Sequence, residues 1–222
     1  MGPIAAPPRL NLPVIAATLQ SVQREFDAIN RRLAAWRDPM SDDVIANMVA
    51  GYALVDALVA DRVELFAMGN LNRLLELNKV VLCGPNPDRH ALYTAHVEAT
   101  ARRFYDERHA GIEDVVEWYA GHAVEPVWTR AAGVYVRILS KPQLFIEGNH
   151  RTGALVMSYV LVREGQPPFV LSADNAAAYF EPSATIRDST KTGVATFFRQ
   201  VMIRRRLTAL LLRHCDRRHL TA

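Results

Sequence analysis

The segment from Thr152 to Glu164 constrains the fold more than any other part of this sequence. Its apolar residues lie on nearly every side of a helix instead of along one stripe. A helix of this kind is surrounded by protein, because each of its faces needs a partner. Gly165 and the pair Pro167 and Pro168 follow it, as is typical of a helix cap and a breaker. The chain is therefore expected to fold around one central helix.

The elements around this helix are also predicted to be helices. Apolar residues recur at steps of three and four along most of the chain, which is the period of an amphipathic helix. The expected helices cover residues 13–36, 42–67, 71–77, 88–105, 112–120, 126–139, a segment opened by Ser172, and 190–214. A short extended piece at 169–171 and one candidate β-hairpin near 79–93 are the only strand signals. We therefore predict an all-α bundle with a small hairpin flap.

Length and composition favour one domain and exclude several classes of function. The 222 residues, half of them hydrophobic, suffice for one sizeable core, and proline-rich residues 1–12 are expected to be a flexible tail before a domain at 13–222. A net charge of only +3 predicts no nucleic-acid partner. The longest apolar run, 154–162, is shorter than the ~20 residues that cross a bilayer, so no membrane is expected. Two distant cysteines give neither a disulfide framework nor a zinc site, which favours a reducing, cytoplasmic location.

The loop before the central helix carries the candidate chemistry. Residues 145–151 read Phe-Ile-Glu-Gly-Asn-His-Arg. Gly148 permits close backbone approach, the first N–H groups of the helix point toward the loop, and Arg151 can grip phosphate oxygens. Glu147 can hold a Mg²⁺ that bridges those phosphates. These residues predict an anion cradle, although spacing alone favours a plainer interpretation, a turn with Asn149 capping the helix and Arg151 in solvent.

The same loop resembles the active loop of the Fic (Fido) family, whose motif is H-P-F-x-[DE]-G-N-G-R-x-x-R. Five positions match the motif, and two more match residues that are frequent between its arginines. The five are Phe145, Glu147, Gly148, Asn149 and Arg151, and the two are Thr152 and Gly153. The resemblance extends over roughly residues 45–185 and implies a Fic-like helical bundle.

What the resemblance implies is nucleotidyl transfer. In the family, a protein hydroxyl attacks a nucleotide phosphate, usually the α-phosphate of ATP, and the motif histidine accepts the proton. The implied cofactors are a nucleotide, ATP or a related one, and Mg²⁺ on Glu147. The implied partners are that nucleotide and a target protein. The implied nucleotide-binding residues are Phe145, Gly148, Asn149, Arg151, Thr152 and Gly153.

The chain departs from the motif at positions that matter for chemistry. Gln143 stands in place of the histidine, Leu144 of the proline, His150 of the second glycine and Ala154 of the second arginine. An amide cannot accept a proton at neutral pH, and losing a general base removes ~10² to 10⁴ in rate. Without the second arginine, the grip on the outermost phosphate should weaken. A diphosphate, another nucleotide or a phosphate ester therefore remains open as the ligand.

His150 and the pair Ser21 and Glu25 each have two possible interpretations. His150 is the only imidazole in the loop and can replace the missing base if its ring turns toward the phosphate site, and otherwise it is a partly exposed loop residue. Ser21 and Glu25 have the spacing of the inhibitory helix found in many Fic proteins, [ST]-x-x-x-E-[GN]. Phe26 fails the last position and Ala154 removes the arginine partner, so a solvated helix face is expected.

Three hypotheses about function remain. The first is a divergent Fic-type protein nucleotidyltransferase, AMPylation-like and impaired, with Gln143 and His150 as the candidate catalytic residues. The second is a catalytically inactive module that keeps the fold and binds a nucleotide or a protein. The third is a helical protein without a ligand.

Overall fold

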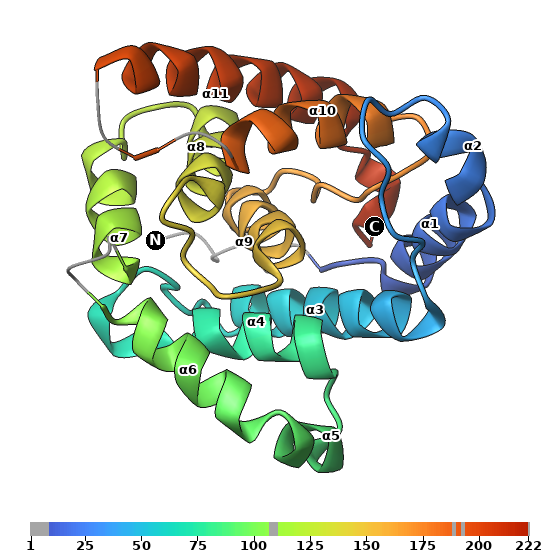
Figure 1. Cartoon of the computed structure of the whole chain (residues 1–222), viewed down its shortest axis with the longest axis horizontal. Coiled ribbons are helices and arrows are strands. Elements are labelled where there is room, and N and C mark those ends of the chain that lie inside the picture. The colour runs from blue at the N-terminus through green and yellow to red at the C-terminus, as the bar shows by residue number, and fades with distance from the viewer. Residues whose placement is uncertain (1–8, 107–110, 188–189, 192–193, 222) are drawn as a thin grey trace, which may run out of the picture.

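The computed structural model describes residues 9–106, 111–187, 190–191 and 194–221, which form helices joined by short connections (Figure 1). In chain order the α-helices are α1 (Leu12–Arg24), α2 (Phe26–Asn30), α3 (Asp42–Ala60), α4 (Asn72–Cys83), α5 (Pro87–Leu92), α6 (Thr94–Phe104), α7 (Ile112–Gly121), α8 (Val127–Leu139), α9 (Asn149–Arg163), α10 (Ala176–Arg187) and α11 (Val194–His214). Short 3-10 turns lie at Met68–Asn70 and Arg217–His219. The all-α prediction is confirmed.

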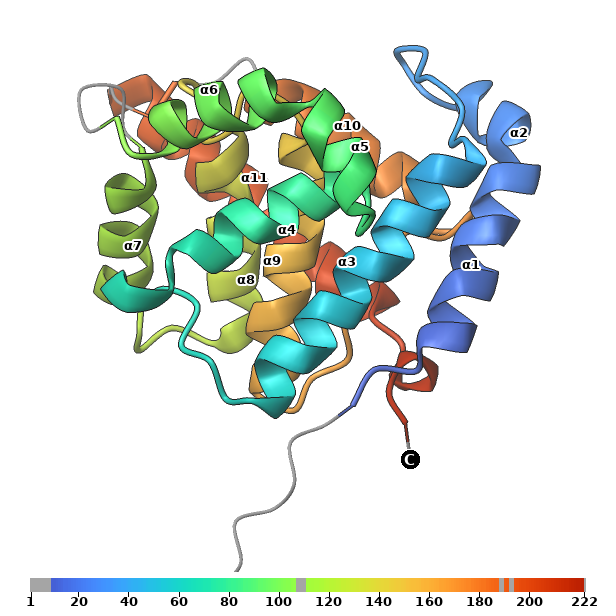
Figure 2. The same ribbon diagram turned by 90° about the horizontal axis from the view of Figure 1, so that it is seen from below.

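Helix α9 lies at the centre of the molecule, and other helices pack on its sides (Figures 1 and 2). Every side chain from Thr152 to Val162 is buried, and α3, α4 and α8 all contact α9. Gly165 ends the helix in the left-handed region at φ +75°, and its amide donates to the Val162 carbonyl at 2.9 Å. The predicted central helix and its glycine cap are therefore confirmed.

Helix α3 is the second large contributor to the core. It packs against α1, α4 and α9, and its buried side chains include Tyr52 and Val55. By length and composition alone, α3 is also long and apolar enough to cross a membrane, a feature that the search for unbroken apolar runs missed. Half of its apolar window is buried among the other helices of the fold.

The β-hairpin predicted near residues 79–93 is wrong. Helix α4 continues to Cys83, and α5 begins at Pro87 after a tight turn. Gly84 makes the turn at φ +73°, and the Asn86 side chain accepts a hydrogen bond from the Asp88 amide at 2.9 Å, which caps α5. The proline and glycine signals therefore mark a helix–helix turn. Strand pairing in the described residues is limited to two isolated bridges.

Two predicted helices are shorter than their apolar patterns. The segment 13–36 forms α1 and α2, with a break at Glu25, and the segment 42–67 ends as a helix at Ala60. The extended piece 169–171 and the turn opened by Ser172 precede α10, which begins at Ala176.

The two ends of the described chain meet on one side of the molecule (Figure 2). Leu10 is buried and pairs with Leu220, and the Asn11 amide donates to the His219 carbonyl at 2.8 Å. The Arg9 guanidinium binds the Asp56 carboxylate of α3. Of the predicted tail, residues 1–8 lie outside the described residues, and residues 9–12 belong to the folded body.

Candidate functional site

The loop between α8 and α9 is anchored by buried residues. Phe145 is 1% exposed, and its ring stacks on Phe104 of α6 with 5.7 Å between the centroids. The Asn149 side chain, also buried, accepts from the Phe145 amide at 2.9 Å and donates to the Phe145 carbonyl at 2.8 Å. Asn149 therefore fixes the loop with its side chain and has only its backbone amide to offer a ligand.

The glycine before α9 fits a crowded position. Gly148 is at φ +74°, and a Cβ there would lie 3.0 Å from Asn78 Nδ2. This buried Nδ2 of α4 donates to the Glu147 carbonyl at 2.9 Å and to Thr152 Oγ1 at 3.0 Å. Asn78 thus fastens both the end of the loop and the first turn of α9.

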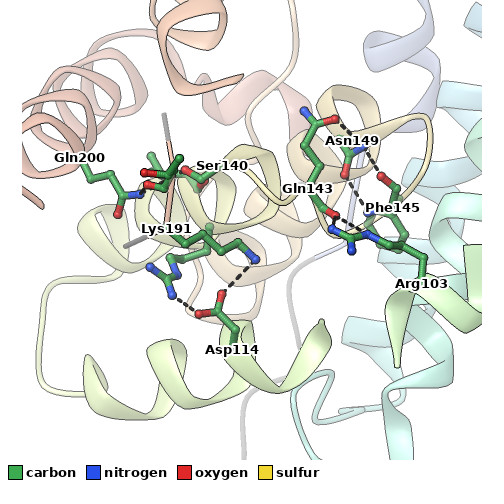
Figure 3. A network of polar contacts seen from close by, with 11 residues as sticks. Arg103, Asp114, Ser140, Gln143, Phe145, Asn149, Lys191 and Gln200 are labelled. Atoms are coloured by element: carbon green, nitrogen blue, oxygen red, sulfur yellow. Dashed lines mark hydrogen bonds and ion pairs between the residues drawn. The ribbon is translucent and has the colours of Figure 1, made fainter. Parts of the chain in front are cut away.

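Gln143, at the position of the family's general base, is tied to the protein on both sides. Its Nε2 donates to the Leu139 carbonyl at 3.2 Å, and its Oε1 accepts from Asn149 Nδ2 at 3.4 Å. The Arg103 guanidinium of α6 donates to the Gln143 carbonyl through Nε at 3.1 Å and Nη2 at 2.8 Å (Figure 3). The side chain is held by weak hydrogen bonds and the backbone by strong ones.

The start of α9 presents backbone N–H groups that have no acceptor among the residues described by the structure. Within the described residues, no protein group accepts a hydrogen bond from the amides of Gly148, Asn149 or Arg151. The first amides of a helix lack intrahelical partners, and together with the helix dipole they favour an anion. The cradle geometry predicted from the sequence therefore has its donors available.

Arg151 lies beside these amides and is half-buried rather than pointing into solvent. Its Nη1 donates to the Val81 carbonyl near the end of α4 at 3.1 Å. Burial lowers the pKa of Arg151, and the Glu147 charge opposes that shift. Arg151 lines two cavities, one of about 420 Å³ that it shares with His150 and Ala154, and one of about 540 Å³ that it shares with Glu147.

His150 is partly exposed, as expected, but it belongs to the first turn of α9 and not to the loop. Its Nδ1 lies 3.1 Å from the Tyr135 hydroxyl, and its carbonyl accepts from the Tyr179 hydroxyl at 3.1 Å. The ring lines the 420 Å³ cavity. A role as a base stays a prediction.

Three residues that the resemblance implies at the nucleotide instead pack against the protein. Phe145 is in the core, Thr152 is fully buried against Asn78, and Gly153 leaves room for a close approach of α8. A Cβ at Gly153 would lie 2.9 Å from a ring carbon of Tyr135. These residues shape the loop and the start of α9, and their contact with a nucleotide stays a prediction.

Glu147 is the carboxylate of the site and is exposed at the rim of the 540 Å³ cavity. Among the described residues, no group of three or more His, Cys, Asp or Glu side chains can hold a metal ion by itself. Mg²⁺ is commonly bound by one or two carboxylates together with substrate phosphates. One exposed carboxylate beside a phosphate cradle fits that use and does not fit an independent metal site.

Asn78 and Arg103 were missed by the sequence analysis. An asparagine on the buried face of a helix is a usable signal, because buried polar groups need hydrogen-bond partners. Arg103 carries no such signal, since its target lies 40 residues away in sequence.

Comparison with known proteins identifies the fold. No family model matches the sequence. A Fic-domain signaling protein from Bacteroides thetaiotaomicron superposes with a TM-score of 0.50 and 13% identity, over 90% of this chain and 87% of that one. The chain has the helical fold of a Fic/Fido domain. The Fic resemblance noted from the loop and the Fic-like bundle are thereby confirmed.

Two curated relatives share shorter regions. Protein adenylyltransferase fic-1 of Caenorhabditis elegans is 29% identical over 72 residues, which are 31% of this chain and 14% of that protein. The Caenorhabditis briggsae protein of the same name is 25% identical over 120 residues, 50% of this chain and 23% of that protein. The matched regions are thus under a quarter of the relatives' own length.

Ser21 and Glu25, which have the spacing of the inhibitory helix, bond to each other. Ser21 Oγ donates to Glu25 at 2.8 Å on an exposed surface, which agrees with a solvated helix face. Phe26, which follows, is 3% exposed and lines the same 420 Å³ cavity as Ala154. Phe26 and Ala154 stand where an inhibitory contact would have polar residues, and both line this mainly apolar cavity.

Proposed function

We propose that this Fic domain binds a Mg²⁺-nucleotide or a related organic phosphate at the start of α9 and transfers the nucleotidyl group to a protein hydroxyl only weakly. The observation that carries the proposal is the set of unused amides at Gly148, Asn149 and Arg151 beside the Arg151 guanidinium. Backbone donors at a helix start bind phosphate oxygens, and a guanidinium adds paired, charge-assisted hydrogen bonds.

Glu147 would hold the Mg²⁺, whose chemistry is to neutralise phosphate charge. Arg151 would orient the phosphate, since its Nη1 is fixed on the Val81 carbonyl and the residue lines both cavities. Gln143 would position an incoming hydroxyl by hydrogen bonding without accepting its proton. Transfer is therefore expected to be ~10² to 10⁴ slower than with a general base.

A second candidate, the inactive binding module, is favoured by the contacts of Gln143. Both polar atoms of this side chain already bond to Leu139 and Asn149. A hydroxyl acceptor would have to displace one of them. The module would then recognise a nucleotide or a protein without modifying it.

Calorimetric titration with Mg²⁺ and a panel of nucleotides tests binding. Arg151→Ala should weaken binding at least tenfold, because a charge-assisted bond contributes about 1.5–3 kcal/mol. Arg102→Ala, an exposed arginine of α6, is the matched control and should bind like the unaltered protein. Absence of binding by every nucleotide and by inorganic phosphate would contradict the proposal.

Incubation with α-labelled nucleotide and cell extract tests transfer. The unaltered protein should label a target weakly, and Gln143→His should label it more strongly if Nε2 reaches the hydroxyl. Label that appears only with Gln143→His would favour the binding module over the weak transferase.

A further inference from the structure

The cavity beside the phosphate cradle has properties that a nucleotide phosphate chain does not require. Its volume is about 420 Å³, which lies in the range of roughly 300–1,000 Å³ typical of small-molecule sites.

The walls of the cavity are mainly apolar and come from distant parts of the chain. They are formed by Phe26 of α2, Met48 and Tyr52 of α3, Phe169 before α10, and Phe180 of α10. Tyr52 does not offer its hydroxyl to the cavity, because it donates to the Phe169 carbonyl at 2.6 Å. Apolar walls of this kind favour an apolar occupant over water.

The missing second arginine of the Fic motif is what leaves the space open. Ala154 lines the cavity from α9, one turn after His150 and Arg151. An arginine at this position would carry its guanidinium toward the apolar walls. Alanine removes both the charge and the volume at this point of the wall, next to His150 and Arg151.

Positive charge reaches the cavity from two sides. Arg151 borders it from α9, and Arg37 borders it from the segment between α2 and α3, with its guanidinium 5.4 Å from the Phe180 ring centre. Arg37 Nε is buried and has no acceptor among the described residues. Asp38 is the one carboxylate among the lining residues, so the guanidinium groups outnumber it. The space is thus apolar in its body and suited to an anion at its border.

We propose that this cavity holds the apolar body of an organic phosphate whose phosphate group faces Arg151 and the start of α9. The inference rests on the proposed phosphate cradle and specifies its ligand class, an ester of phosphate with an aliphatic or aromatic group. A triphosphate would leave the apolar walls uncovered.

A chain-length series on the unaltered protein tests the inference. Calorimetric titration with inorganic phosphate and with butyl, hexyl and octyl phosphate should show affinity rising about fourfold for each methylene that is buried. Octanoate should bind at least tenfold more weakly than octyl phosphate, because it lacks the phosphate oxygens. Affinity that does not depend on chain length, or octanoate equal to octyl phosphate, would overturn the inference.

Two variants locate the binding. Ala154→Leu should fill the cavity and flatten the chain-length series while inorganic phosphate still binds. Ala57→Leu, on the exposed side of α3, is the matched control and should keep the series. If affinity rises with alkyl length equally in both variants, the alkyl group binds outside this cavity and the proposal is refuted.

Failure of this inference is separable from failure of the proposed function. Binding of Mg²⁺-ATP with a flat alkyl series would remove the cavity assignment alone. No binding of inorganic phosphate, Mg²⁺-nucleotide or alkyl phosphate would remove both.

Discussion

The substitution Asn149→Asp tests whether the candidate loop is held by one side chain. The change preserves the size of the residue and the bond that Oδ1 accepts from the Phe145 amide at 2.9 Å. It replaces Nδ2, the donor to the Phe145 carbonyl at 2.8 Å, by an oxygen. The carbonyl of this buried residue then loses its partner and faces a carboxylate.

The expected loss of stability follows from these contacts. A buried acceptor left without its hydrogen bond costs about 1–3 kcal/mol. A negative charge at the first residue of α9 gives back about 0.3–1 kcal/mol through the helix dipole. The matched control is Asn72→Asp, the same change at the first residue of α4, where the side chain is exposed. Only the favourable dipole effect is expected in the control.

Urea denaturation should therefore separate the two variants by about 1–3 kcal/mol in the free energy of unfolding. The melting temperature should follow at roughly 2–4 °C per kcal/mol for a domain of this length. Two variants within about 0.5 kcal/mol of each other would refute the role given to Asn149, because surface changes of this kind fall in that range.

Four further substitutions test other parts of the structure by the free energy of unfolding. Gly148 and Gly165 both have a φ near +75°, so replacing either by alanine should lower the free energy of unfolding by about 1–2 kcal/mol. The loss should be larger at Gly148, where a Cβ would be crowded, and equal losses would argue against that crowding. Arg103→Met should lose about 1–3 kcal/mol through its two bonds to the loop, and full retention of stability would contradict that clamp. Burial lowers the pKa of His219, so its contribution is present above the unfolded pKa near 6.5 and is lost as pH falls through the lowered value. His219→Gln should flatten that pH dependence, and an unchanged pH profile would count against it.

The central helix could be predicted from the sequence because its apolar residues lie on nearly every side, which indicates burial. A segment that is apolar on every side has one physical solution, and Gly165 marks its end. The break at Glu25 has no such local signal, since neither glycine nor proline stands near it. Phe26 and Ile29 of α2 share a small apolar cluster with Val22 of α1 and Ala176 of α10, a tertiary contact that no local pattern shows.

The candidate site was predictable in its residues and less so in their directions. The motif spacing identified Gly148 and Arg151, and both lie at the start of α9 as expected. The motif could not show that the Asn149 side chain forms hydrogen bonds with the Phe145 backbone, because these depend on the path of the loop. Nor could it reveal the clamp from Arg103, which joins the loop only through the fold.

The two main departures from the Fic motif should affect transfer more than binding. Removing a general base at Gln143 acts on the transition state, where the proton must leave, and has little effect on the bound ground state. Replacing the second arginine by Ala154 should weaken the hold on one end of the proposed ligand, and Ala154 lines the apolar cavity proposed for its other end. The amides at the start of α9 depend on backbone geometry, which Asn78 and Asn149 maintain from opposite sides. Side-chain divergence does not remove such donors, so phosphate binding should outlast nucleotidyl transfer in this chain.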